Sequence, residues 1–91
     1  MNKGELIDAI SEKTDLTKRA ADELLSAAIE VIMETVANGE KVTLVGFGTF
    51  EPRTRAAREG RNPQTGAAIQ IAATTVPAFS AGKLFKDKVA G

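Results

Sequence analysis

One segment in the second half of the chain constrains the fold more than any other: Gly60–Gly66, with the sequence GRNPQTG. Its glycines, asparagine and proline predict an exposed turn. The turn follows Arg53, Arg55 and Arg58, and it precedes a run without a charged residue, 67–80. A segment of this composition cannot build a core of its own, so we expect an arm that contacts a negatively charged partner.

The length of the chain predicts a single small domain, residues 1–91, with a thin core. The chain has no Trp or Tyr, and its aromatic residues are four phenylalanines. We therefore expect a homodimer in which two copies share one core. Within the domain we expect a helical dimerisation part over 1–40, a sheet over 41–80 with an arm at about 53–76, and a C-terminal helix over 81–91.

The residue types that are missing argue against several classes of function. Without Cys or His, the chain offers no disulfide, no thiolate or imidazole metal ligand and no histidine general base. It has no fingerprint of a glycine-rich phosphate loop. We therefore expect no enzyme activity, no metal or other cofactor and no small-molecule substrate. No stretch predicts a signal peptide or a membrane span, so we expect a cytoplasmic protein.

The charges are divided unevenly along the chain, although the formal net charge is zero. Residues 1–40 carry four basic and nine acidic residues, for a net charge of −5. Residues 41–91 carry eight basic and three acidic residues, for a net charge of +5. This division favours a basic working surface on an acidic body, although chance placement on a solvated surface would give the same totals.

Two helices are predicted in the first part of the chain. Asn2 and Glu5 have the spacing of a capping box, and the apolar residues that follow predict a helix at about 3–13. A second, longer helix should begin after Thr17, a favourable N-cap, and end at Gly39. Together the two helices form a helical hairpin.

The second helix carries a wide apolar stripe, which we interpret as part of the dimer core. A DNA-reading helix-turn-helix is the alternative, but the exposed face of this helix is acidic and phosphates would repel it. The residues predicted to build the dimer core, from this stripe and from the sheet, are Leu25, Ile29, Ile32, Leu44, Phe47, Phe50 and Phe79.

From Lys41 the hydrophobic pattern alternates, which predicts a strand that ends at the tight turn Gly46–Gly48. The return strand starts at Thr49. Because proline has no N–H, Pro52 marks a sheet edge or the point where the strand leaves the sheet.

Two limbs, at about 53–61 and 67–76, should then pair as a long hairpin. Arg53 and Arg55 share one face by alternation, whereas Arg58 falls on the other face. Either a bulge redirects Arg58 or the arm uses both faces. An isolated two-stranded ribbon is marginally stable in water, so the end of the arm should be mobile until it binds a partner.

The chain should return from the arm to the body at Phe79, which acts as an anchor. Ser80 is then the expected N-cap of a final helix at 81–89. The side chains expected to point inward from this helix are Leu84, Phe85 and Val89, and those expected to point outward are Lys83, Lys86 and Lys88.

The arginines of the arm, with Arg61 in the turn, suit a nucleic-acid groove. Arginine pairs with phosphates through two donors and enters narrow minor grooves. The amides of Asn62 and Gln64 can bond to the degenerate acceptors on the floor of the minor groove. Pro63 is rigid and apolar, and such a wedge between base pairs kinks a duplex. The alternative is ordinary turn chemistry for Pro63 and its neighbours.

Three separated motifs of the chain resemble the bacterial histone-like HU family, which is related to integration host factor. They are the turn Gly60–Gly66, the segment Val42–Phe50 and the segment Val76–Lys83, and the opening Asn2–Leu6 also fits. The resemblance covers essentially the whole chain. The small number of lysines resembles cyanobacterial members of the family.

The resemblance implies an α+β fold: an N-terminal helical hairpin, a three-stranded antiparallel sheet with a long protruding β-arm and a short C-terminal helix, assembled as an intertwined homodimer. It implies that two arms embrace double-stranded DNA in the minor groove, with Pro63 as the intercalating residue. The residues that it places at DNA are Lys3, Arg53, Arg55, Arg58, Arg61, Pro63, Lys83 and Lys86, with Lys18 and Lys41 as weaker candidates. Asn62 and Gln64, predicted from their amides, complete the set of expected DNA contacts.

We therefore expect an architectural protein that binds DNA without sequence specificity, bends it and compacts the nucleoid. Bent, nicked or gapped duplexes should bind better than straight ones, because kinking costs several kcal/mol. The alternatives are a sequence-selective DNA-bending protein like integration host factor, and a module that binds an acidic protein. Three features depart from the family pattern. The return limb of the arm is neutral, Ser80 stands at a position where lysine is common, and the pI is low, at about 6.2. These departures concern flanking contacts and affinity, not the arm.

Overall fold

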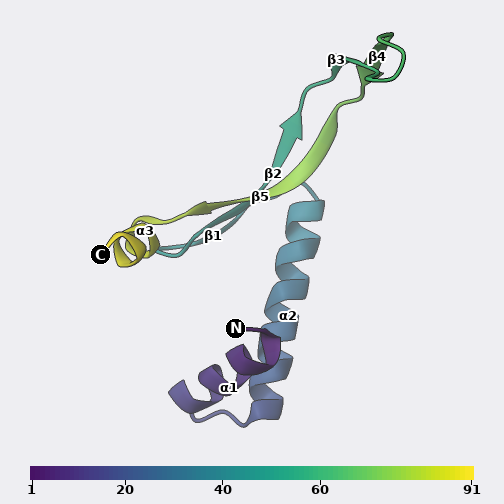
Figure 1. Cartoon of the computed structure of the whole chain (residues 1–91). Helices are drawn as coiled ribbons and strands as arrows, with labels where there is room; N and C mark the ends of the chain where they lie inside the picture. Colours follow the sequence, from purple (N-terminus) through teal and green to yellow (C-terminus); the bar gives the residue numbers. More distant parts are fainter. The chain divides into compact units, whose positions relative to one another are not determined.

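The fold consists of two short helices, a long helix and five strands, described by a computed structural model that covers residues 1–91, except for the side chain of Ile71. In chain order the elements are α1 (Lys3–Lys13), α2 (Lys18–Ala37), β1 (Val42–Leu44), β2 (Gly48–Arg55), β3 (Arg58–Arg61), β4 (Ala68–Ile71), β5 (Thr74–Ala81) and α3 (Lys83–Ala90) (Figure 1). The chain divides into two compact units, Met1–Glu34 and Thr35–Gly91. The sequence predicts one domain.

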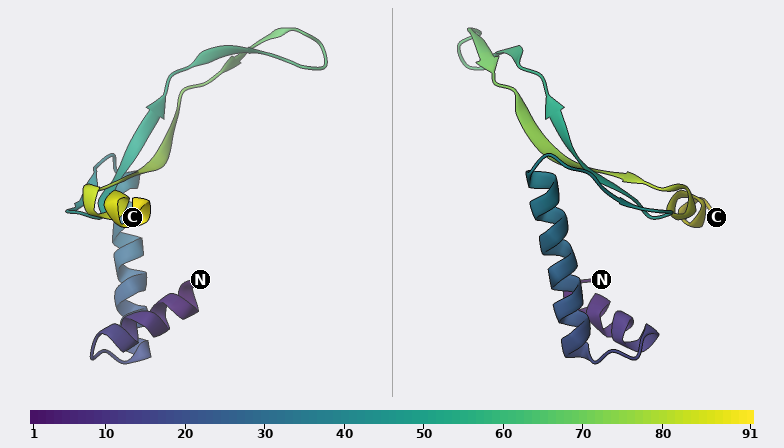
Figure 2. Two further views of the ribbon diagram at one scale, coloured as in Figure 1. Left: turned by 60° about the vertical axis from the view of Figure 1, so that its left-hand side comes forward. Right: turned by 180° about the vertical axis from the view of Figure 1, so that it is seen from behind.

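The first unit is the predicted helical hairpin, and both expected N-caps are present. Asn2 Oδ1 accepts the N–H of Glu5 at 2.9 Å, and Thr17 Oγ1 accepts the N–H of Ala20 at 3.1 Å. These bonds satisfy N–H groups that a helix start otherwise leaves without a partner. α1 turns back alongside the first turns of α2, as the views in Figures 1 and 2 show.

The end of α2 confirms the predicted glycine cap. Gly39 has a φ of +88°, and its N–H donates to the carbonyl of Val36 at 3.0 Å. The next N–H, of Glu40, donates to the carbonyl of Thr35 at 3.1 Å. This pair of bonds is a Schellman motif, in which glycine takes the left-handed position because it has no Cβ.

The three-stranded antiparallel sheet has the order β1-β2-β5. β1 pairs with the start of β2, with Val42 opposite Phe50, whereas β5 pairs along the whole of β2. Pro52 lies beyond the part of β2 that β1 covers, and it faces Pro77 across the pair, where neither residue has an N–H to donate. Of the two predicted alternatives the sheet edge is therefore confirmed: from Pro52 onward β2 is an edge strand, and it stays paired with β5 through Arg55.

The start of α3 is held against the turn between β1 and β2. The N–H of Gly82 donates to the carbonyl of Phe47 at 2.7 Å, and the N–H of Phe85 donates to that of Gly46 at 3.1 Å. A Cβ on Gly82 would lie 2.8 Å from the backbone of Gly46, so this close approach requires glycine. The expectation that Ser80 caps the helix is wrong. β5 continues through Ser80, and Gly82 is the N-cap, without a side-chain cap.

All four phenylalanines gather in one cluster of the second unit. The ring centroids of Phe50 and Phe79 are 4.8 Å apart, and Phe47 stacks on Phe85 at 5.4 Å. The cluster joins the start of β2 and the end of β5 to α3, as the anchoring role of Phe79 predicts. Leu84 and Val89, expected to point inward, are 70% and 76% exposed in the single chain.

A single chain encloses very little core. Among the side chains that the structure describes, the buried hydrophobic residues are Ala21 and Val36. Met33 on α2 is 60% exposed, and none of the seven residues predicted for the dimer core is buried. Within the described residues, no helix is both long enough and apolar enough to cross a membrane.

Candidate nucleic-acid interface

The arm consists of two paired segments separated by a break in both limbs. The inner segment is the end of the β2–β5 pair, which finishes with Arg55 opposite Thr74. The outer segment is the β3–β4 pair, in which Arg58 faces position 71 and Arg61 faces Ala68. The described pairing thus confirms two limbs and a turn, but the ladder is interrupted where the sequence predicts continuous strands.

The break is symmetric and leaves the register unchanged. It spans residues 56–57 on one limb and 72–73 on the other, and all four of these residues are alanine. Because each limb contributes two residues, neither has the extra residue that defines a β-bulge. Alanine has low strand propensity and offers little cross-strand packing, which accounts for the loss of pairing here.

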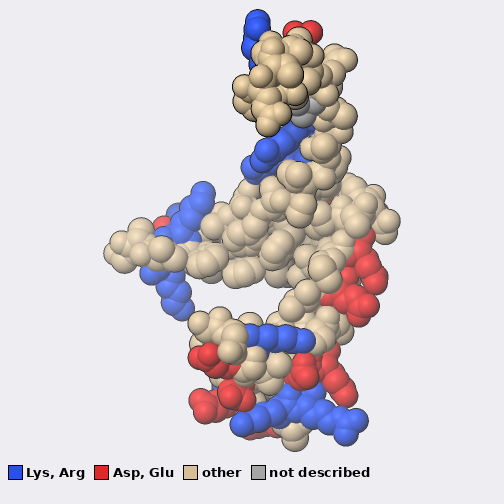
Figure 3. Space-filling model, turned by 45° about the vertical axis from the view of Figure 1, so that its right-hand side comes forward, with Lys and Arg blue, Asp and Glu red and all other residues tan. Residues whose placement is uncertain are grey.

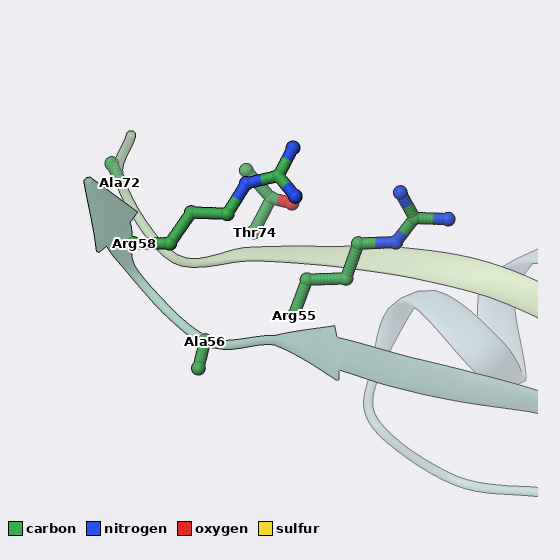
Figure 4. Close-up of a pocket in the computed structure, with 5 residues that line it drawn as sticks. All are labelled: Arg55, Ala56, Arg58, Ala72 and Thr74. Carbon is green, nitrogen blue, oxygen red and sulfur yellow. The ribbon is translucent and has the colours of Figure 1, made fainter. Parts of the chain in front are cut away.

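The break places Arg55 and Arg58 on the same side of the arm. In Figure 4 their side chains extend from the outgoing limb in the same direction, towards the limb that carries Thr74. Together with Ala56 and Ala72 they line a shallow hollow of about 350 Å³. The sequence left two alternatives open: a bulge that redirects Arg58, or an arm that uses both faces. The side chain of Arg58 is redirected to the side of Arg55, but a break in the ladder, not a bulge, produces this.

Neither of these two arginines forms an ion pair within the described part of the chain. Both are exposed, and the charge near the hollow is therefore uncompensated. Two guanidinium groups beside a hydroxyl group are donors suited to an anionic oxygen group such as a phosphate. The arm thus presents a cationic site of the kind that its composition predicts.

Arg53, at the base of the arm, is engaged within the protein. Its Nη2 lies 3.2 Å from Oε1 of Glu51 and donates to Oγ of Ser80 at 3.3 Å. Glu51 also pairs with Lys41, whose Nζ lies 3.5 Å from Oε2. This network was not predicted from the sequence. The signal was present, because Glu51 and Arg53 are two residues apart on one strand and therefore share a face.

The tip of the arm is a turn closed by its own hydrogen bonds. The N–H of Asn62 donates to the carbonyl of Ala67 at 2.8 Å, and the N–H of Gly66 donates to the carbonyl of Asn62 at 2.7 Å. Arg61 Nη1 donates to the carbonyl of Gly66 at 3.4 Å. Pro63 and Gln64, also predicted at the tip, are exposed. The turn thus presents a proline on a defined backbone.

The basic residues predicted on the body differ in their availability. Lys83 and Lys86 lie on α3, and the described contacts include no ion pair for either. Lys3 is engaged: its Nζ lies 3.4 Å from Oδ1 of Asp22 and donates to Oγ of Ser26 at 2.8 Å. Lys18, a weaker candidate, pairs with an aspartate of α1 at 3.4 Å. DNA would have to compete with these carboxylates for the lysines of the first unit.

The charge distribution of the two units agrees with the division along the sequence. Figure 3 shows basic side chains along the arm, and it shows acidic and basic side chains mixed on the helical unit. Of the described acidic residues, only Glu59 lies on the outer segment of the arm. The arm is therefore the part of the second unit where cations extend into solvent with little opposing charge.

The comparisons with known proteins agree with these features. A profile of the family described as bacterial DNA-binding protein matches residues 1–90. The DNA-binding protein HU of a Nostoc strain is 64% identical over 90 residues, which cover 99% of this chain and 96% of that protein. The chain belongs to the HU family. HU of a Synechocystis strain is 62% identical, again over 99% of this chain and 96% of the relative.

Solved structures of the HU family share the fold. A structure of Anabaena HU crystallised with DNA is 64% identical and superposes with a TM-score of 0.89, covering 99% of this chain and 98% of that chain. An HU variant of Thermotoga maritima is 36% identical, with a TM-score of 0.73 and coverage of 98% and 99%. The predicted family and α+β fold are therefore confirmed, including the resemblance to cyanobacterial HU proteins.

Proposed function

We propose that this HU-family protein is an architectural DNA-binding protein that grips double-stranded DNA with its arm and bends it. The observation that carries this proposal is the pair of unopposed guanidinium groups, Arg55 and Arg58, on one side of a two-stranded ribbon with a proline at its tip. The similarity to an HU protein crystallised with DNA supports it. A polyanionic duplex is a partner that such a ribbon can follow along a groove.

We also propose that the working form is a homodimer, with residues 1–40 as its helical dimerisation part, the arm at about 53–76 and the C-terminal helix as a support. The exposed apolar face of α2 and the exposed phenylalanine cluster support this assembly. Leu44 and Phe47 are 44% and 45% exposed, an unfavourable state for side chains of this kind in a stable monomer. A second copy that covers both surfaces would give two arms and one shared core.

The proposed DNA contacts are ordered by availability. Arg55, Arg58 and the tip would contact the minor groove first, and Lys83 and Lys86 on α3 would contact flanking phosphates. Arg53 and Lys3 would join only when DNA displaces their carboxylate partners, Glu51 and Asp22. The pair of Lys3 and Asp22 is exposed, and because exposed ion pairs are worth about 0–1 kcal/mol, the phosphates of a duplex can replace it. The side chain of Glu51 is only 21% exposed, so Arg53 is held more firmly.

A gel-shift series at several salt concentrations tests the proposal. If two arms neutralise about six to eight phosphates, the slope of log affinity against log salt should lie at about −5 to −7. A nicked or gapped duplex should bind more tightly than an intact one, because the distorted site lowers the cost of kinking. Affinity that does not change with salt, or an equal affinity for both duplexes, would contradict the proposal.

Pro63→Ala tests the proposed wedge separately. The variant should keep the fold and the dimer but lose much of the bend, because alanine is too small to enter between base pairs. The bend angle is measured by energy transfer between dyes at the two ends of a duplex. An unchanged angle would leave Pro63 as a turn residue only.

Selection from random duplexes decides between the proposed non-specific mode and a sequence-selective one. The tip offers amides to the minor groove, where A·T and T·A pairs present the same acceptors, so we expect no enriched sequence beyond a preference for flexible steps. We propose, on the same basis, that the protein is associated with the nucleoid. Binding to an acidic protein that plain duplex DNA does not displace would favour an interaction module.

A further inference from the structure

The turn at the tip of the arm is organised around one residue, Asn62. Asn62 takes part in three hydrogen bonds: its N–H donates to Ala67, its carbonyl accepts from Gly66, and its Oδ1 accepts the N–H of Gln64 at 2.9 Å. It is half-buried, whereas the residues from Pro63 to Ala67 are all exposed. Asn62 is therefore folded into the turn, as the alternative of ordinary turn chemistry predicts, and its Oδ1 is not free to reach for bases.

The side-chain bond of Asn62 closes around Pro63. The acceptor Oδ1 belongs to the residue before the proline, and the donor N–H belongs to the residue after it. This is the geometry of an Asx turn, which fixes the backbone of the residue that it encloses. The ring of Pro63 also fixes its own φ, so both the entry to the proline and the exit from it are constrained.

The other side-chain bonds of the turn are longer. Thr65 Oγ1 accepts the N–H of Ala67 at 3.3 Å, and Arg61 Nη1 reaches the carbonyl of Gly66 at 3.4 Å. The Thr65 bond lies on the return side of the turn, and the Arg61 bond crosses the base of the turn, so neither joins the two residues next to Pro63. The short bond from Asn62 is therefore the side-chain contact that sets the orientation of the proline.

We propose that Asn62 is a positioning residue for Pro63, and that its Oδ1 holds the proline in the geometry that enters the base stack before DNA is bound. This inference rests on the proposed function, in which Pro63 is the wedge. Holding the wedge in advance removes an ordering cost from the binding step. The role uses the oxygen of the amide, whereas a contact to the groove floor would use its nitrogen as a donor.

A double-mutant cycle between Asn62→Ala and Pro63→Ala tests the proposal. Bend angle at saturating protein and dissociation constant are measured on a nicked duplex labelled with dyes at both ends. Asn62→Ala should move the bend angle most of the way to that of Pro63→Ala and weaken binding by about 2- to 10-fold, the value of one hydrogen bond. In the Pro63→Ala background, Asn62→Ala should change the bend angle no further.

Two further variants make the result specific. Asn62→Ser keeps an acceptor that can form the same kind of turn, although more weakly, and should restore part of the bend. Asn38→Ala makes the same chemical change in the turn after α2 and should match the wild type in bend and affinity. Circular dichroism before each titration confirms that every variant is folded.

The outcomes separate this inference from the proposed function. Equal losses from Asn62→Ala in both backgrounds, without rescue by serine, would show a direct DNA contact and overturn the positioning role. If Pro63→Ala leaves the bend unchanged, there is no wedge to position, and the inference fails while DNA binding stands. If the wild-type protein does not bind the duplex at all, the proposed function fails with it.

Discussion

At the scale of single residues, the cations of this chain fall into two groups that composition does not separate. Arg55 and Arg58 extend from the arm without a described acidic partner, whereas Arg53 and Lys3 are held by Glu51 and Asp22. Each group has the same formal charge. Only in the first group is there no described carboxylate that would compete with a binding partner for the cation. The position of a charge relative to its neighbours therefore matters more for binding than the net charge of zero.

Arg58→Ala should weaken DNA binding by a similar factor for every sequence. Two arms would each lose one phosphate contact, so the salt slope should become shallower by about 1.8, and affinity near 0.1 M salt should fall by about 10- to 60-fold. Arg58→Lys is the matched control, since it keeps the charge and should keep the slope. A loss confined to some sequences would indicate direct base readout instead.

At the scale of elements, the sequence predicted the types and most of the boundaries. The 3.6-residue pattern and the caps Asn2, Thr17 and Gly39 located α1 and α2, because capping depends on neighbours in the chain. The start of α3 was misplaced, because two close contacts with the turn at Gly46 decide it, and such contacts leave no local signal. A helix docked by its backbone can begin where no side chain caps it.

The break in the arm could not be predicted from the sequence either, for a different reason. Alternation along a strand gives each residue a face only while the ladder is continuous. The four alanines at the break were visible, but their weak strand propensity is a small effect that other contacts often override. The network around Glu51 is only partly of this kind: the shared face of Glu51 and Arg53 follows from their spacing, whereas the contacts with Lys41 and Ser80 depend on which side chains meet across the sheet.

Gly82→Ala should destabilise the protein through the docking of α3. The added Cβ would meet the Gly46 backbone at 2.8 Å, and relieving such overpacking typically costs about 1–3 kcal/mol. A thermal melt by circular dichroism at fixed protein concentration should show a midpoint lower by several degrees. Gly4→Ala is the control: its Cβ would lie 3.4 Å from Asn2 Oδ1, and alanine favours the helix, so its midpoint should stay the same or rise.

At the scale of the whole molecule, a single copy leaves most of its large apolar side chains in water. Ile29, Leu44 and Phe79 are 41%, 44% and 40% exposed. A domain of this size buries only about 60% of its unfolded surface even when it is compact, so such exposure leaves little to offset the entropy of folding. Folding and assembly of two copies are therefore expected to be one process.

The midpoint of thermal unfolding should accordingly rise with protein concentration, because assembly stabilises the folded state by mass action.

Ile29→Lys, on the apolar face of α2, should remove the dimer in analytical ultracentrifugation and lower the midpoint, since a lysine would be forced into the shared core. Glu30→Lys introduces the same residue at the next position, on the polar face, and should leave the dimer intact. A monomer with a sharp, concentration-independent transition would refute the shared core.

The matched break in the two limbs has a consequence for how such an arm can vary in length. The pairs Arg55–Thr74 and Arg61–Ala68 belong to one uninterrupted register. The outgoing and returning limbs therefore have the same number of residues between these two pairs. Removing one alanine from the outgoing limb would shift every later pair and turn the side chain of Arg58 to the opposite side. Descendants of this chain can lengthen or shorten the arm only by equal steps on both limbs, if the proline and the arginines are to reach the same groove.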